Sequence, residues 1–95
     1  MKVSYLKHIF IINPIAGKKN AARGLIPFIE QYFKQNCGDY DIVETNYQGH
    51  ARLIAESCAK SGKKIRLYAC GGDGTLSEIV NSVVLYPNVE VGSIP

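Results

Sequence analysis

The segment from Ile65 to Leu85 constrains the fold more than any other part of the sequence. It opens with a short apolar run, Ile65–Cys70, which two adjacent glycines bring to an end. Apolar residues then return at intervals of three and four, at Leu76, Ile79, Val80, Val83 and Val84. This spacing is typical of one face of a helix. The segment is therefore predicted to fold as a strand, a glycine-rich turn and a helix from about Thr75 to Leu85.

The turn between them has the composition of a phosphate site. Gly71, Gly72 and Gly74 permit positive φ and let a ligand approach the backbone, while the following helix directs free N–H groups at the same place. Asp73 lies within the turn. A carboxylate beside a phosphate is repulsive unless it holds a metal ion or receives a proton. The turn therefore favours phosphoryl transfer.

A purely structural interpretation of the same residues stays open at this point. Thr75 and Glu78 have the spacing of a capping box, and Asp73 is also a suitable helix cap.

The rest of the chain continues the alternation of strands and helices. Further strands are predicted at Leu6–Ile12, Tyr40–Thr45 and Val89–Ser93, and a helix at His50–Lys60 that Ser61-Gly62 stops. Another helix has apolar residues from Ala22 to Phe33; Pro27 either bends it or lies near its start, and Asn36-Cys37-Gly38 closes it in a left-handed conformation.

This order predicts a three-layer α/β/α fold with a mainly parallel sheet. Ligands bind such sheets outside the carboxyl ends of the strands. Asn13, Thr45 and the Gly71–Gly74 turn follow successive strands directly, so they are expected at one edge.

Composition limits the class of protein. The chain has 95 residues, of which 46% are apolar, so it suffices for one compact soluble domain. No apolar run approaches the roughly 18–20 residues of a membrane span. Its three cysteines match no zinc or redox spacing, which indicates reduced thiols in a cytoplasmic protein.

The basic residues are unevenly placed. Lys18, Lys19 and Arg23 precede the first acid, and a second basic cluster covers residues 60–66. No aromatic residues alternate with these charges as stacking platforms for bases, so we expect no nucleic-acid partner. An anionic nucleotide or a transient anionic membrane surface fits better.

Two common phosphate loops do not fit the sequence. Gly17-Lys18 is followed by Lys19, where a Walker A loop has Ser or Thr. Gly72 and Gly74 open a Rossmann-like pattern, but Ser77 replaces its third glycine and Glu90 is predicted in the middle of a strand.

Three motifs together resemble a known family. Gly71-Gly72-Asp73-Gly74-Thr75 with Glu78 is similar to the nucleotide-binding motif of the diacylglycerol kinase catalytic domain family, which includes bacterial lipid kinases and sphingosine kinases. NAD kinases and phosphofructokinases share the fold and a form of this turn. Asn13-Pro14-x-Ala16-Gly17-Lys18 and Thr45 followed by Gly49-His50-Ala51 resemble further lipid-kinase motifs, and NAD kinases are not expected to carry them in this form. Two positions depart from the family's pattern. This chain has Asn81-Ser82 where the family commonly has Asn-Gly, and it has Ala16 where Ser is frequent.

The resemblance implies an ATP-dependent lipid kinase that transfers the γ-phosphate to a hydroxyl of diacylglycerol or a related lipid, with Mg²⁺. Asp73 is the expected catalytic residue, as a positioner of Mg²⁺ or as the proton acceptor. The expected nucleotide-binding residues are Asn13, Pro14, Ala16, Gly17, Thr45, Gly71, Gly72, Asp73, Gly74, Thr75 and Glu78. No residues are assigned as a protein metal site. Asn13 alternatively satisfies backbone groups at a strand end, and Thr45 with Gln48 has capping-box spacing. We interpret His50 as structural.

By the same resemblance, residues 1–95 are the N-terminal nucleotide-binding domain of a longer enzyme. The C-terminal β-rich domain that would supply the lipid pocket is not in the sequence, so we expect the isolated fragment to be inactive and prone to self-association. Two alternatives stay open: an NAD kinase-like enzyme and a nucleotide-binding domain without catalysis. We expect the enzyme to be cytoplasmic and to associate peripherally with the membrane that contains its lipid substrate.

Overall fold

The computed structural model describes residues 6–14 and 23–94. The elements follow in the order β1 (Lys7–Ile12), the short 3₁₀ helix η1 (Arg23–Leu25), α1 (Ile26–Gln35), β2 (Asp39–Glu44), α2 (His50–Lys60), β3 (Ile65–Cys70), α3 (Asp73–Val83) and β4 (Val89–Ile94). The predicted alternation of strands and helices is confirmed, and β3 and α2 have the predicted bounds.

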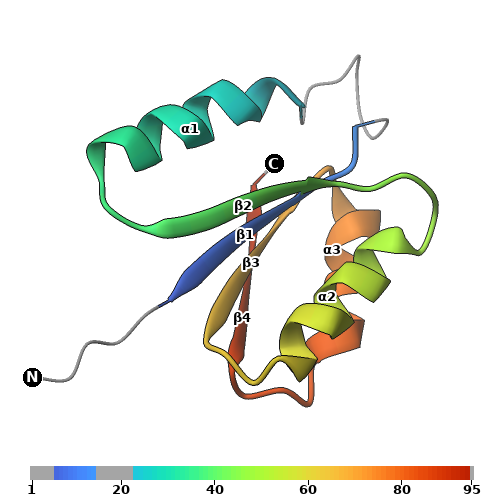
Figure 1. The fold of residues 1–95 in the computed structure, drawn as a ribbon. Helices are drawn as coiled ribbons and strands as arrows, with labels where there is room; N and C mark the ends of the chain where they lie inside the picture. The colour runs from blue at the N-terminus through green and yellow to red at the C-terminus, as the bar shows by residue number, and fades with distance from the viewer. Residues whose placement is uncertain (1–5, 15–22, 95) are drawn as a thin grey trace, which may run out of the picture.

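The four strands form one parallel sheet in the order β2-β1-β3-β4. Helix α1 covers one face, and α2 and α3 cover the other, which confirms the three-layer α/β/α architecture (Figure 1). In the central pairs Ile12 is level with both Glu44 and Cys70. The three strands therefore end side by side, and the residues that follow them meet at one edge.

Alternating side chains of the central strands contribute to two separate hydrophobic cores, one on each face of the sheet. Ile9 and Ile11 of β1 pack with Leu67 of β3 against the small residues of α2 and against α3. Phe10 and Ile12 point to the opposite face, where they pack with Ile29 of α1. A strand buried on both faces needs the continuous apolar run seen in β1, because both sets of side chains leave water.

Helix α1 begins at Ile26, with Pro27 in its first turn. In the first turn Pro27 removes no helical hydrogen bond, since the missing N–H would have no partner there in any case. The predicted left-handed closure is wrong. Asn36 is extended at φ −124°, and its backbone and side-chain N–H groups both donate to the Tyr32 carbonyl, at 2.9 and 3.0 Å.

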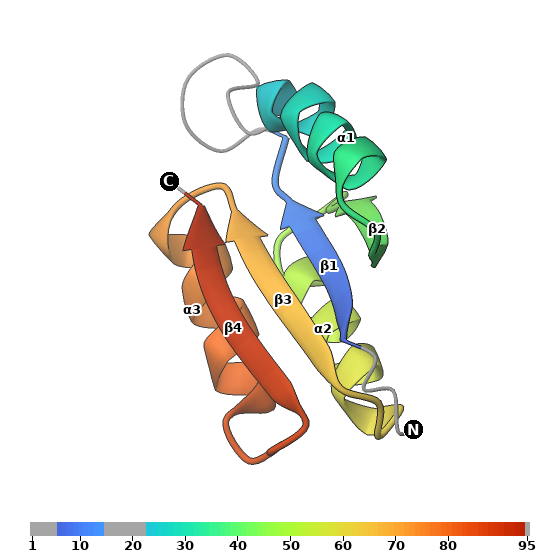
Figure 2. The ribbon, with the colours of Figure 1, turned by 90° about the vertical axis from the view of Figure 1, so that its left-hand side faces the viewer.

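On the face of the sheet that α1 covers, the helix lies over β1 and β2. On this same face β3 and β4 are therefore more open (Figure 2). Large apolar side chains are exposed on the helices as well, including Phe28 on α1 and, just past α3, Leu85, which is 88% exposed. This surface agrees with the expected apolar exposure, while self-association stays a prediction. No helix in the described part of the chain is long and apolar enough to cross a bilayer.

The cysteines are free thiols in very different surroundings. Cys37 is exposed, whereas Cys70 is fully buried beneath α1 and Cys58 is half-buried. Burial raises the pKa of Cys70 to about 11, and burial also raises the pKa of Cys58. Because the thiolate is the nucleophile, both buried thiols are poor targets for alkylation near neutral pH.

We therefore expect iodoacetamide at pH 7.5 to modify Cys37 first and Cys70 only after unfolding. Peptide mass spectrometry of the native and the denatured protein measures the order, and Cys37→Ser provides the background rate. Modification of Cys70 in the native protein at the rate of Cys37 would contradict the packing beneath α1.

Candidate functional site

The ends of three strands are joined laterally at the carboxyl edge of the sheet. The backbone N–H of Thr45 donates to the Ile12 carbonyl at 2.8 Å, and that of Asn13 donates to the Cys70 carbonyl at 3.0 Å. Asn13 therefore lies between Thr45 on one side and Gly71 on the other. This arrangement confirms that the residues following β1, β2 and β3 share one edge.

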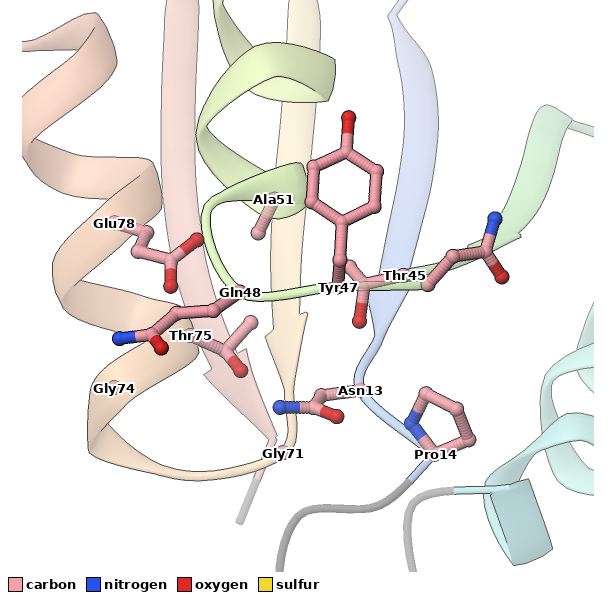
Figure 3. A pocket seen from close by; sticks show the side chains of 11 residues that line it. Asn13, Pro14, Thr45, Tyr47, Gln48, Ala51, Gly71, Gly74, Thr75 and Glu78 are labelled. Atoms are coloured by element: carbon pink, nitrogen blue, oxygen red, sulfur yellow. The ribbon is translucent and has the colours of Figure 1, made fainter.

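A cavity of about 590 Å³ opens above this edge. Its lining comes from the ends of β1 and β3, from the loop between β2 and α2, and from the first turns of α2 and α3 (Figure 3). The lining residues are Asn13, Pro14, Thr45, Asn46, Tyr47, Gln48, Ala51, Gly71, Gly74, Thr75 and Glu78. A volume of this size suits a small organic ligand.

Most of the predicted binding residues line this one cavity. Gly72 and Asp73 belong to the same turn but are not part of the lining, and the Asp73 side chain is exposed. Ala16, Gly17 and the two lysines that follow them lie outside the described residues. The sequence interpretation missed Asn46, Tyr47, Gln48 and Ala51, although all four closely follow the end of β2.

The glycine turn has a conformation that other residues rarely adopt. Gly71 has φ 149° and Gly72 has φ 101° with ψ −175°. Helix α3 begins immediately afterwards at Asp73, where the Leu76 N–H donates to the Gly72 carbonyl at 3.2 Å. The negative side chain of Asp73 is favourable in this first turn because it faces the positive end of the helix dipole.

The capping interpretations of the turn are wrong. Gly72 is the N-cap of α3 and no side chain caps that helix, so Thr75 and Glu78 lie inside it and Asp73 does not precede it. Likewise Gly49, at φ 92°, is the N-cap of α2, and Thr45 and Gln48 form no capping box. No side chain therefore caps the first-turn N–H groups of either helix, although the His50 N–H of α2 donates to the Tyr47 carbonyl at 3.1 Å.

Two buried hydroxyl groups complete the polar lining. Thr45 and Thr75 are 8% and 4% exposed, and both contribute to the cavity wall. Their side chains and the Asn13 amide point toward the middle of the cavity (Figure 3). Among the described lining residues only Glu78 carries a charge. The cavity therefore offers backbone N–H groups, hydroxyls and an amide to a ligand.

Contacts behind the lining fix its positions. The guanidinium of Arg23 donates two hydrogen bonds to the Glu44 carboxylate, at 2.7 and 3.3 Å, which joins η1 to the end of β2 next to Thr45. These bonds lower the pKa of the Glu44 carboxyl. At the start of α2, His50 Nδ1 accepts a hydrogen bond from the Asn46 N–H at 2.9 Å, which agrees with a structural role for His50.

No group of three or more His, Cys, Asp or Glu side chains suited to a metal ion occurs within residues 6–14 and 23–94. A bound cation would need ligands from elsewhere, such as the phosphates of a nucleotide. Mg²⁺ is commonly held in this way, through one or two carboxylates and the substrate's phosphates.

Comparison with known proteins identifies the family. The model of the diacylglycerol kinase catalytic domain matches residues 7–95. A diacylglycerol kinase of Staphylococcus haemolyticus is 36% identical over 86 residues, which are 90% of this chain and 26% of the relative. Sphingosine kinase 2 of Arabidopsis thaliana is 32% identical over 76 residues, which are 80% of this chain and 16% of the relative.

The fold is also similar to that of a solved structure. A crystal structure of a diacylglycerol kinase from Bacillus anthracis superposes with a TM-score of 0.69 at 28% identity, covering all of this chain and 32% of that structure. The chain thus spans a third or less of each relative's length. With the domain model matching from β1 to the last residue, the chain belongs to the diacylglycerol kinase catalytic domain family.

Proposed function

We propose that this chain is the ATP-binding part of a lipid kinase that transfers the γ-phosphate of ATP to a hydroxyl of diacylglycerol or a related lipid. The observation that supports the proposal best is the cavity at the carboxyl edge of the sheet. Its lining combines Gly71 and Gly74 of the glycine-rich turn with Asn13 and Thr45 from the neighbouring strand ends. Membership of a kinase family makes a phosphate ligand the natural occupant.

The chemistry of the lining suits a nucleotide triphosphate. The first turn of α3 directs uncapped N–H groups and the positive end of its dipole at the phosphates. Thr75 and Asn13 add neutral donors, so negative charge is met by hydrogen bonds and by the helix dipole. Glu78 can only accept hydrogen bonds when ionised, so it suits a ribose hydroxyl better than a phosphate.

Asp73 is the residue of this chain that would hold Mg²⁺ against the phosphates. Its carboxylate lies in the glycine turn beside the cavity, is exposed and is an oxygen donor of the kind that Mg²⁺ prefers. When bound, the ion neutralises charge that develops on the phosphates. The alternative role for Asp73 is to receive the proton from the lipid hydroxyl.

Binding of the lipid acceptor involves the whole protein in this proposal. We propose that residues beyond this chain complete the acceptor site, that the cytoplasmic enzyme meets its lipid at an anionic membrane surface, and that residues 1–95 alone do not phosphorylate it. Phosphoryl transfer depends on positioning the acceptor, the metal ion and the phosphate together. In this chain the cavity would position the phosphate and Asp73 the metal ion, so we expect the rest of the protein to position the acceptor.

NMR titration of the 95-residue protein with Mg²⁺-ATP tests the proposal. We expect shifts of the backbone N–H signals of Gly71, Gly74 and Thr75, together with those of Asn13 and Thr45. Thr75→Val, which keeps the shape of the side chain and removes its hydroxyl, should weaken binding by about tenfold, as expected for a lost ligand hydrogen bond of about 1.4 kcal/mol.

Shifts confined to the basic residues 60–66, or no shifts at millimolar ATP, would contradict the proposal. This basic segment lies at the opposite end of the sheet, after α2, so it serves as an internal control for attraction of ATP by charge alone. Tests of diacylglycerol and NAD as acceptors, on an enzyme of the relatives' full length, separate a lipid kinase from an NAD kinase-like enzyme.

A further inference from the structure

Tyr47 is an aromatic residue that the cavity leaves largely open. It lies in the loop between β2 and α2, lines the same cavity as Gly71 and Gly74, and is 56% exposed. Removing a large aromatic ring from water is more favourable in free energy than removing a smaller side chain. Aromatic side chains that line a ligand cavity therefore usually contact the ligand.

The Tyr47 ring is held on one face by His50. It stacks on the His50 ring with a centroid distance of 4.5 Å and an interplanar angle of 10°. His50 is fixed in turn, because its Nδ1 accepts the Asn46 N–H at 2.9 Å. One face of the tyrosine is thus occupied and its orientation is set, while the exposed fraction leaves the rest of the ring available. Figure 3 shows the ring above Thr45, on the side away from Gly71.

We propose that Tyr47 is the platform on which the base of the nucleotide stacks, an inference that rests on the proposed binding of ATP. A planar base can lie parallel to the open face of the ring and extend the stack that His50 begins. Such stacking tolerates different bases, because every base presents a π-face. The surroundings agree with this role: the neighbouring lining residues Asn46, Gln48 and Ala51 are uncharged, as a neutral base requires.

The position also divides the cavity between the two ends of a nucleotide. Gly71, Gly74 and Thr75 lie at the glycine turn, where negative phosphates meet helix N–H groups. Tyr47 lies across the cavity on the β2–α2 loop, separated from that turn by Asn13 and Thr45 (Figure 3). A ligand that is charged at one end and aromatic at the other matches this distribution.

Binding of ATP and of tripolyphosphate to variants of the 95-residue protein tests the inference. Tyr47→Ala should weaken ATP by about tenfold and leave tripolyphosphate unchanged, because tripolyphosphate has no base. Tyr47→Phe should retain ATP affinity within about twofold, since the π-face remains. Tyr32→Ala is the matched control: Tyr32 is 57% exposed but lies on α1, on the other face of the sheet.

A direct readout excludes a merely supporting role for the ring. In the ATP complex, nuclear Overhauser effects are expected between the Tyr47 ring protons and the adenine protons H2 or H8. Their absence in a saturated complex would overturn the inference, as would an equal loss of ATP and tripolyphosphate affinity in Tyr47→Ala. Unchanged ATP affinity in that variant would overturn the platform but leave the proposed function standing, whereas a wild-type protein that does not bind ATP would end both.

Discussion

Replacing Gly72 with Val is expected to abolish ATP binding and to destabilise the chain. Gly72 adopts φ 101° and ψ −175°, a combination that is essentially restricted to glycine. A valine there costs about 1–3 kcal/mol unless the turn changes conformation. A Cβ on Gly72 would meet no protein atom within 4 Å, so protein packing does not require this glycine. The backbone conformation requires it, and a phosphate bound at the turn would need the space that a Cβ occupies.

Gly74→Ala separates the backbone requirement from the space that a phosphate needs. Gly74 is helical, and a Cβ there also meets nothing within 4 Å. Alanine should stabilise the helix by roughly 0.5–1 kcal/mol. Because Gly74 lines the cavity, the same methyl group should obstruct a phosphate. We therefore expect lower ATP affinity in a variant that melts at a higher temperature.

Isothermal titration calorimetry and thermal unfolding measure both quantities in the same samples. Gly62→Val is the control for strain alone, since Gly62 has φ 76° and lies after α2, at the end of the sheet away from the cavity. It should lose stability and keep ATP affinity. If Gly72→Val changed ATP affinity by less than about tenfold, which is 1.4 kcal/mol, the glycine turn would not be the phosphate site.

Most element types were predictable because their segments carry a clear apolar period, whereas Asp41 and Glu44 weaken that pattern in β2. The continuous run in β1 indicates a strand buried on both faces, and the three-and-four spacing of α2 indicates a helix with one buried face. Strand order was not predictable in this way. The position of β1 between β2 and β3 depends on which crossovers pack together, and no local pattern encodes that choice.

The helix starts show where reasoning from local sequence fails. Thr75 and Glu78 have the spacing of a capping box, yet α3 begins at Asp73 because the conformation of Gly72 places the first helical hydrogen bond there. Side-chain caps are one way to begin a helix, and a backbone turn that leaves N–H groups free for a ligand is another. A predicted cap that the structure does not use is therefore itself informative about the site.

The candidate site was predicted in part for a simple geometric reason. In a parallel sheet, residues that follow successive strands meet at one edge, so Asn13, Thr45 and Gly71 could be grouped from the sequence. Tyr47 was missed because its contribution depends on the turn at Gly49, with φ 92°, and on the stack with His50. These are tertiary features, although the position of Tyr47 two residues after Thr45 was a usable signal.

Asp73→Asn is expected to change the Mg²⁺ dependence of ATP binding in two opposite directions. Without Mg²⁺, the carboxylate repels the phosphates, so its removal should strengthen binding of free ATP. With Mg²⁺, the carboxylate holds the ion, so its removal should weaken binding. Charges about 4 Å apart interact by roughly 1 kcal/mol in water and about 4 kcal/mol near a protein surface. The ratio of the two dissociation constants should therefore shift by about a hundredfold.

Calorimetric titrations with ATP in EDTA and in excess Mg²⁺ give this ratio for each variant. Glu30→Gln removes the same charge from an exposed position on α1, outside the cavity lining, so it corrects for the change in net charge. If Asp73 instead serves only to receive the proton of the acceptor hydroxyl, Asp73→Asn will strengthen ATP binding with and without Mg²⁺ alike. A ratio within threefold of that of Glu30→Gln would therefore exclude the metal-positioning role and leave proton transfer as the function of this carboxylate.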